Sequence, residues 1–255
     1  SEMDYVSFGR GSRALVLLPG LGDGLATVKG MALPLAWAWR AYAKDYSVFV
    51  FSRKNELPEH FSTRDMAQDQ AGAMRALGLT DADIIGVSQG GMIAQYLAID
   101  HPELVRRLVL AVTLAGGPNE LLQSTVNGWI ELAKRADHKA LMIDTAEKSY
   151  SEKALRGYRM LYPILGCIGR PQDYKRFITQ ANACIRHDAR GELHRINCAT
   201  LVVGGACDRI VGANAAAELA QGIAGSEYFL YEGLGHAAYE EARDFNRRVL
   251  RFLTG

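Results

Sequence analysis

Short apolar runs of strand type alternate with helix-type segments through the first 116 residues of the chain. The strand-type runs are rich in β-branched residues and end at glycine, proline or aspartate, which is typical of buried strands. They cover residues 5–8, 14–18, 47–52, 82–87 and 108–113. Helical spacing of apolar residues predicts helices at 34–44, at 62–77 and from Gly90 onward. Alternation of this kind predicts an α/β protein with a mostly parallel, twisted sheet flanked by helices.

The alternation stops after residue 116 and resumes near residue 196. The intervening stretch has helical spacing without a convincing strand, and predicts helices at 121–135, 139–150, 152–165 and 173–185. Beyond it, strands are predicted at 199–204 and 227–231, with helices at 214–223 and 239–253. We therefore expect a core made of residues 1–116 and 196–255, with residues 117–195 inserted into it as a helical cap.

Composition and charge narrow the partners without identifying one. The chain has 255 residues, is 49% hydrophobic and 22% charged, and carries a formal net charge of +1. A nearly neutral chain has no general field that attracts nucleic acid or an anionic membrane surface. The apolar runs are far shorter than the ~20 residues that span a bilayer, and no signal-peptide pattern is present. A cytoplasmic protein without nucleic-acid or membrane partners is expected, and its oligomeric state is left open.

The four cysteines do not form a recognisable framework. Cys167, Cys184, Cys198 and Cys207 are scattered, with no Cys-x-x-Cys pair and no clustered histidines. Neither a zinc site nor a set of disulfides is indicated. The cysteines are expected to be small buried apolar residues, and no metal is expected.

The most informative motif is Gly-x-Ser-x-Gly, at residues 86–90, where a strand-type run meets a helix-type run. In a nucleophile elbow the serine occupies a strained turn between a strand and a helix, and the two glycines let the backbones approach closely. A match of this length occurs by chance in many chains, but this one stands at the predicted junction. Ser88 is therefore the candidate nucleophile.

A serine hydroxyl needs a base, and the base needs a carboxylate that orients it. Of the six histidines, only His236 follows a predicted strand in a glycine-rich loop, and Asp208 follows the strand at 199–204 in the same way. These positions correspond to the carboxyl edge of a parallel sheet, where such folds assemble their sites. Asp83 and Asp100 are expected to lie away from this edge, because one precedes its strand and the other ends a helix.

Two backbone amides are also required to stabilise the oxyanion that forms during attack. Gln89 follows the nucleophile, and Leu21 lies in the glycine-rich loop after the strand at 14–18. We assign the two amides to these residues. The same loop lacks the Gly-Lys-Ser/Thr ending of a phosphate-binding loop and the dinucleotide fingerprint.

Together these segments resemble the α/β-hydrolase superfamily. The resemblance is carried by Pro-Gly-Leu-Gly at 19–22, the motif around Ser88, residues 204–211 with Asp208, and Gly-Leu-Gly-His ending at His236. It implies an α/β-hydrolase fold, a Ser-Asp-His triad, a two-amide oxyanion hole and a helical cap over the pocket. Many relatives have His-Gly where this chain has Pro-Gly at 19–20, and the amino-terminal strands look abbreviated, but neither difference removes a catalytic group.

The resemblance favours acyl transfer through Ser88 without a cofactor. Family members that dehalogenate haloalkanes or open epoxides use aspartate at the nucleophile position. A carboxylesterase-like hydrolase acting on a small, uncharged or mildly polar ester is expected. Related C–C bond hydrolases, lactonases, iminopeptidases and perhydrolases stay open, as does a receptor that binds a ligand on this scaffold without turnover.

The cap is expected to choose the substrate. Its candidate pocket residues could line an apolar pocket, but they have the spacing of ordinary helix packing residues, and the sequence favours that packing role for them. These residues are Met142, Tyr150, Tyr158, Met160, Tyr162 and Phe177.

Overall fold

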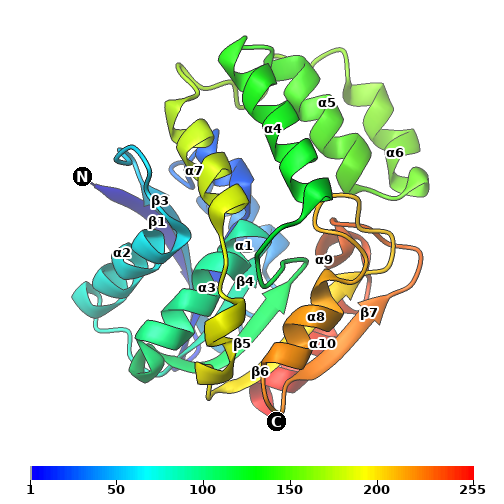
Figure 1. Ribbon diagram of the computed structural model, residues 1–255. Helices are drawn as coiled ribbons and strands as arrows, with labels where there is room; N and C mark the ends of the chain where they lie inside the picture. Colours follow the sequence, from blue (N-terminus) through cyan, green and yellow to red (C-terminus); the bar gives the residue numbers. More distant parts are fainter. Residues whose placement is uncertain (1) are drawn as a thin grey trace.

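The computed structural model describes residues 2–255, and a seven-stranded sheet forms its centre (Figure 1). The strand order is β1-β3-β2-β4-β5-β6-β7; β1 pairs antiparallel with β3, and the other neighbours are parallel. The strands are β1 (Met3–Gly9), β2 (Arg13–Leu18), β3 (Tyr46–Lys54), β4 (Ala82–Val87), β5 (Val105–Ala111), β6 (Ala199–Gly205) and β7 (Glu227–Tyr231). The mostly parallel sheet flanked by helices that the alternation predicts is confirmed; residue 1 lies outside the described residues.

Helices cover both faces of the sheet. Successive strand side chains point to opposite faces, so Val16 and Leu18 of β2 pack on one side while Leu15 and Leu17 pack on the other. The first side is covered by α2 (Thr63–Ala76), α3 (Gln89–Asp100) and α8 (Ala215–Gly222). The second side is covered by α1 (Ala32–Ala38), α9 (Ala238–Glu241) and α10 (Phe245–Thr254). Two apolar layers therefore hold the sheet rigid between them.

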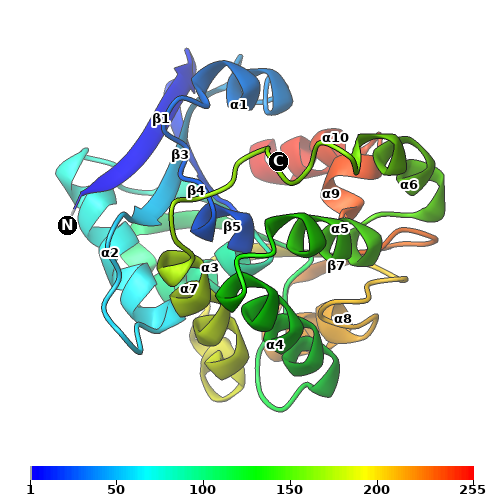
Figure 2. The ribbon, with the colours of Figure 1, turned by 90° about the horizontal axis from the view of Figure 1, so that it is seen from above.

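The segment between β5 and β6 is helical, and we call residues 117–195 the insertion. It contains α4 (Glu120–Lys134), α5 (His138–Ser149), α6 (Glu152–Tyr158) and α7 (Lys175–Arg186), with short 3-10 turns η3 (Arg159–Leu161) and η4 (Arg190–Arg195). In Figures 1 and 2, α4, α5 and α6 lie together on one side of the sheet, and α7 runs between them and α2.

The start of the insertion lies beside the residues that follow α7, its last α-helix. Gly116 and Asp188 form an isolated antiparallel bridge, and the Ala189 amide donates to the Ala115 carbonyl at 2.8 Å. The chain thus leaves the core after β5 and re-enters it at nearly the same place.

Three predicted helices differ from those observed. The helix expected at 34–44 ends at Ala38, and a series of turns leads to β3. Trp37 is 70% exposed, so its apolar spacing does not reflect burial. The helix expected at 239–253 is split into α9 and α10, and that expected at 152–165 ends at Tyr158 before turns take over. In each case the helical spacing of apolar residues continues in the sequence beyond the point where the helix itself ends.

Two predictions about single residues were wrong. Asp83 does not precede its strand but lies within β4, where it is fully buried and pairs with Arg106. Cys167 and Cys207 are exposed, whereas Cys184 is buried as expected, and all four cysteines are free. An ion pair explains how Asp83 can occupy a strand interior.

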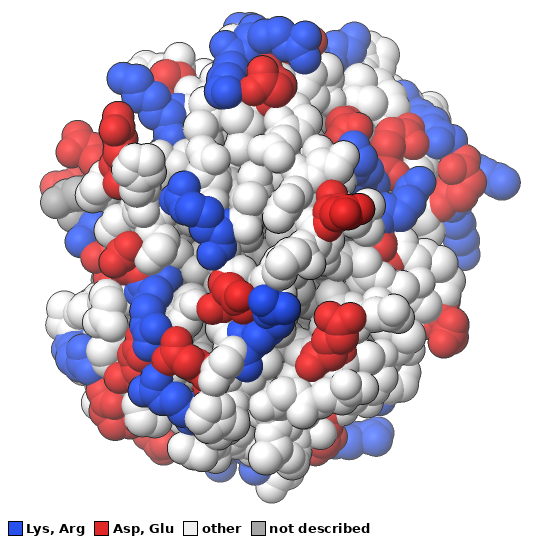
Figure 3. Space-filling view, in the orientation of Figure 1, with Lys and Arg blue, Asp and Glu red and all other residues white. Residues whose placement is uncertain are grey.

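The face of the molecule shown in Figure 3 has mixed charge. In Figure 3, acidic and basic side chains alternate over the face shown, which fits the formal net charge of +1. Within residues 2–255, no helix is both long and apolar enough to cross a membrane.

Candidate active site

Ser88 stands at the sharp turn between β4 and α3. Its backbone has φ 53° and ψ −118°, a conformation that L residues rarely adopt, and its amide donates to the Ala111 carbonyl at 2.9 Å. A methyl group on Gly86 would lie 2.6 Å from the Gly90 carbonyl oxygen, and one on Gly90 would collide with the Leu18 carbonyl. The close approach of these backbones therefore requires both glycines, and it projects Ser88 above the carboxyl edge of the sheet.

His236 joins Ser88 to Asp208. Its Nε2 lies 2.8 Å from Ser88 Oγ, and its Nδ1 lies 2.8 Å from Asp208 Oδ2. An ionised carboxylate only accepts hydrogen bonds, so Nδ1–H donates to Asp208 and Nε2 is free to accept the serine proton. The structure brings the three residues predicted from separate loops into one hydrogen-bonded line.

Asp208 is held ionised in a buried position. Burial disfavours its carboxylate, but the charge and hydrogen bond of His236 and the amides of Ile210 and Val211 outweigh this, so the pKa of Asp208 lies below its usual value. The two amides donate to Oδ1 at 2.8 and 3.0 Å. The Cys207 amide also donates to the Leu234 carbonyl at 2.8 Å, which ties the aspartate loop to the histidine loop.

Leu21 and Gln89 each begin a helical turn beside the serine. Leu21 is the first residue of η1 (Leu21–Gly24), and Gln89 is the first residue of α3. An amide at this position has no acceptor within its own helix, so both are available to a ligand. Leu21 also lines the same pocket as Ser88.

The pocket above Ser88 has a volume of about 400 Å³ and is bounded by both the core and the insertion. Most of its lining is apolar, with the hydroxyl groups of Thr145, Ser149 and three tyrosines as polar points. Besides His236, the lining includes the carboxyl group of Glu240, and no lysine or arginine contributes to it in the part of the chain that the structure describes. The pocket therefore suits an uncharged ligand.

The six candidate pocket residues of the insertion separate into two groups. Met142, Tyr150 and Tyr158 line the pocket. Phe177 is buried in the core of the insertion, Tyr162 donates to Glu147, and Met160 is 81% exposed. Helical spacing alone does not separate these environments, because each depends on how the four helices pack.

The sequence analysis missed a buried polar cluster behind the Leu21 loop. Asp23 accepts from the Arg53 amide at 3.1 Å and from Arg176 Nη2 at 2.5 Å, and its side chain is 1% exposed. Arg53 Nη2 donates to the Pro19 carbonyl at 2.5 Å. The sequence contains one indication of this cluster, because Arg53 directly follows a mostly apolar strand-type run and would be buried if the strand continued.

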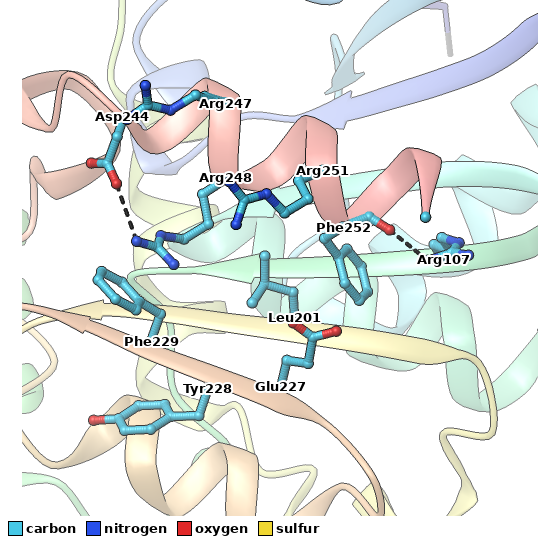
Figure 4. A pocket seen from close by; sticks show the side chains of 11 residues that line it. Arg107, Leu201, Glu227, Tyr228, Phe229, Asp244, Arg247, Arg248, Arg251 and Phe252 are labelled. Carbon is cyan, nitrogen blue, oxygen red and sulfur yellow. Dashed lines mark hydrogen bonds and ion pairs between the residues drawn. The ribbon is translucent and has the colours of Figure 1, made fainter.

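A second hollow, of about 310 Å³, lies between α10 and strands β6 and β7 (Figure 4). It is lined by Arg107, Arg247, Arg248 and Arg251, with Asp244 bonded to Arg248 at 3.1 Å. Glu227 and Leu201 in its lining lie near the amino ends of their strands, whereas the triad lies at the carboxyl ends. This hollow is therefore separate from the site around Ser88.

Comparison with known proteins agrees with this architecture. The family model described as alpha/beta hydrolase fold matches residues 13–243. The chain belongs to the α/β-hydrolase family.

One curated relative of this α/β-hydrolase is the 2-hydroxy-6-oxononadienedioate/2-hydroxy-6-oxononatrienedioate hydrolase of Burkholderia vietnamiensis. The two are 26% identical, and the match covers 99% of this chain and 91% of the relative.

Solved structures show the same fold. An α/β-hydrolase enzyme, MGS-M2, from a Medee basin deep-sea metagenome library superposes with a TM-score of 0.84 at 20% identity, covering 99% of this chain and 94% of that one. The enol-lactonase of Burkholderia xenovorans LB400 gives a TM-score of 0.81 at 22% identity, covering 99% and 96%. At such identities the likeness extends to the fold alone.

Proposed function

We propose that this α/β-hydrolase is a serine hydrolase that cleaves a small, uncharged ester or lactone through an acyl-enzyme on Ser88. The observation that supports this best is the line from Ser88 Oγ through His236 to Asp208, which opens into a pocket without a lysine or arginine among the described residues. No metal or organic cofactor is required for this chemistry.

The proposed reaction begins when His236 Nε2 takes the Ser88 proton as Oγ attacks the substrate carbonyl carbon. The tetrahedral oxyanion then accepts hydrogen bonds from the Leu21 and Gln89 amides. His236 returns the proton to the leaving alcohol as the C–O bond breaks. Water, activated by the same histidine, hydrolyses the acyl-enzyme and releases the acid. Asp208 holds the imidazole in the required tautomer and stabilises it while it is charged.

The lining of the pocket also bears on the substrate class. The relative from Burkholderia vietnamiensis is named for dioate substrates, which carry two carboxylates. A carboxylate that leaves water needs a paired cation, and here the charged residue near the triad is Glu240, which would repel it. We therefore infer a neutral substrate and expect dianionic dienedioates to be poor ones.

Activity-based labelling tests the proposal. A fluorophosphonate probe should modify Ser88 in the native protein and leave Ser88→Ala unlabelled, and peptide mapping should place the adduct on Ser88. Hydrolysis of p-nitrophenyl acetate and butyrate, γ-lactones, an anilide and a dienedioate should then be compared at equal protein concentration.

The outcomes separate the alternatives. Turnover of neutral esters or lactones, with the dienedioate slower by at least ~10-fold, supports the proposed class. Faster cleavage of the dienedioate would contradict it and favour C–C bond hydrolysis. Labelling without turnover on any substrate would favour a receptor, and labelling elsewhere would remove Ser88 from the mechanism.

A further inference from the structure

The two amides assigned to the oxyanion hole come from segments far apart in the sequence, yet one helix of the insertion contacts both. Helix α7 packs directly on η1, where a methyl group on Gly24 would lie 2.8 Å from the Phe177 Cα. It also packs against the start of α3 through the side chain of Gln89. This double contact is the basis of the inference.

On the η1 side, Arg176 of α7 binds four groups of the core. Its guanidinium donates to the Asp23 carboxylate at 2.5 Å, to the Arg53 carbonyl at 3.0 Å, and to the Asp23 carbonyl. Its Nε donates to the Lys54 carbonyl at 3.0 Å. The planar fork of arginine can hold several acceptors in fixed directions, which a lysine cannot reproduce. Arg176 therefore fixes η1 relative to β3.

Asp23 carries this restraint to the oxyanion loop. It is the third residue of η1, two residues after Leu21, and its amide donates to the Gly20 carbonyl at 3.2 Å. Arg53 holds the Pro19 carbonyl from the other side at 2.5 Å. The Leu21 amide is thus flanked by the Pro19 carbonyl, which Arg53 binds, and by the Asp23 carbonyl and carboxylate, which Arg176 binds. These hydrogen bonds limit how the peptide group of Leu21 can rotate.

On the α3 side, Gln89 is fully buried and its Nε2 donates to the Gln180 carbonyl at 2.8 Å and to Cys184 Sγ at 3.1 Å. Gln180 in turn donates to Asp23 Oδ2 at 3.4 Å. The side chain of the second oxyanion residue is therefore bonded to the helix that restrains the first, through positions one turn apart on α7.

We propose that α7 braces the oxyanion hole and that Arg176 is its main positioning residue. The inference rests on the proposed acyl transfer at Ser88. The insertion would then do more than bound the pocket, because it sets the spacing and direction of the two amides that bind the developing charge. The net charge of the Asp23, Arg53 and Arg176 cluster is positive, the sign that also favours an oxyanion.

The test compares Arg176→Lys and Gln89→Met with wild type. Both keep the approximate size of the side chain, and the first keeps its charge. Each should lower kcat for a neutral p-nitrophenyl ester by about 10- to 100-fold, approaching the loss of one oxyanion donor, while KM changes less than about 3-fold. Arg186→Ala, an exposed arginine at the end of the same helix, is the matched control and should behave as wild type.

A trifluoromethyl ketone provides a readout that a merely structural role would not move. It adds to the serine and forms an oxyanion, so its affinity should fall by the same factor as kcat/KM in both variants. Binding of the intact ester, measured in the Ser88→Ala background, should change less than about 3-fold. Thermal unfolding and circular dichroism establish that the compared proteins are folded.

The inference is overturned if either folded variant keeps wild-type kcat, or if activity falls while ketone affinity does not. Should Arg176→Lys fail to fold, Gln89→Met decides alone, because it leaves the charged cluster intact. A wild-type protein that neither hydrolyses the ester nor binds the ketone would instead contradict the proposed function.

Discussion

The carboxyl edge of the sheet and the insertion beside it are built by different kinds of interaction. At the edge, Ser88, Asp208 and His236 are each fixed within a few residues of a strand end, by a tight turn or by backbone amides. The insertion is held by apolar side chains from several helices, as in the cluster around Trp129 and Phe177. Local constraints set the reactive atoms, whereas distant packing sets the shape of the space they face. Changes at the edge, or in the α7 contacts proposed to brace it, should therefore reduce the rate for every substrate, and changes in the pocket lining of the insertion should alter which substrate is preferred.

The largest effect is expected for Ser88→Ala, which removes the proposed nucleophile. Loss of a triad serine costs up to about 10⁶-fold in kcat, and the residual rate should show the same loss for short and long acyl esters. Initial rates on p-nitrophenyl acetate and octanoate measure it. A loss confined to one ester would break the division between the two regions.

Asp208→Asn should lower kcat by about 10⁴-fold, because an amide stabilises the wrong histidine tautomer. The ratio of kcat/KM for the two esters should stay within about 2-fold of wild type, since the pocket is unchanged. Stopped-flow or prolonged steady-state assays can resolve the rate. Near-wild-type turnover would transfer the role of the acid to another carboxylate.

His187 lies at the boundary between the two regions, and it should make the free energy of unfolding depend on pH. It lies where the insertion re-enters the core, beside Thr63 and Gln95, and burial lowers its pKa to about 4. Between pH 6.5 and 4 the unfolded chain binds a proton there and the folded chain does not, so stability falls with pH by about 3 kcal/mol. Above pH 6.5 this contribution is complete.

Urea unfolding of wild type and His187→Gln from pH 4 to 7 measures the effect of His187. The variant should lose this part of the slope, whereas the exposed His194→Gln should retain it. Equal slopes in all three proteins would assign the acid sensitivity to other groups.

The smallest effect is expected for a substitution in the pocket lining that the insertion contributes. Met142→Ala enlarges the pocket and should shift the octanoate-to-acetate ratio of kcat/KM by about 10-fold toward the longer ester, since each buried methylene contributes about 0.8 kcal/mol. Met160→Ala, in a residue that is 81% exposed, is the matched control. An unchanged ratio in Met142→Ala would mean that the acyl chain binds elsewhere.

The features at the carboxyl edge could be predicted from the sequence, whereas the contacts of the insertion could not. Ser88, Asp208 and His236 could be named as candidates from the sequence because each follows a predicted strand, and the structure joins their side chains by hydrogen bonds. The mostly parallel sheet followed from the alternation of strands and helices, the α/β-hydrolase fold followed from the resemblance of four short motifs, and the family comparison confirms that fold. These signals are local, so a single chain carries them.

The features that were missed depend on contacts between distant segments. Nothing near Arg176 in the sequence indicates that it reaches Asp23, 153 positions away. Glu240 borders the pocket beside Tyr150, which lies 90 positions away in the sequence, and its own helix gives no sign of that contact. The apolar periodicity of the insertion predicts helices but not which of their faces borders the substrate.

The bridge between Gly116 and Asp188 makes the helices of the insertion a segment that could be exchanged as a unit. Since its two ends meet at one point of the core, the segment can be lengthened, shortened or exchanged without opening the sheet. The contacts of α7 limit which exchanges keep the enzyme active. A chimera that keeps α7 and replaces the other helices of the insertion should show a new substrate preference at the original kcat. A chimera that also replaces α7 should show the new preference with a reduced kcat.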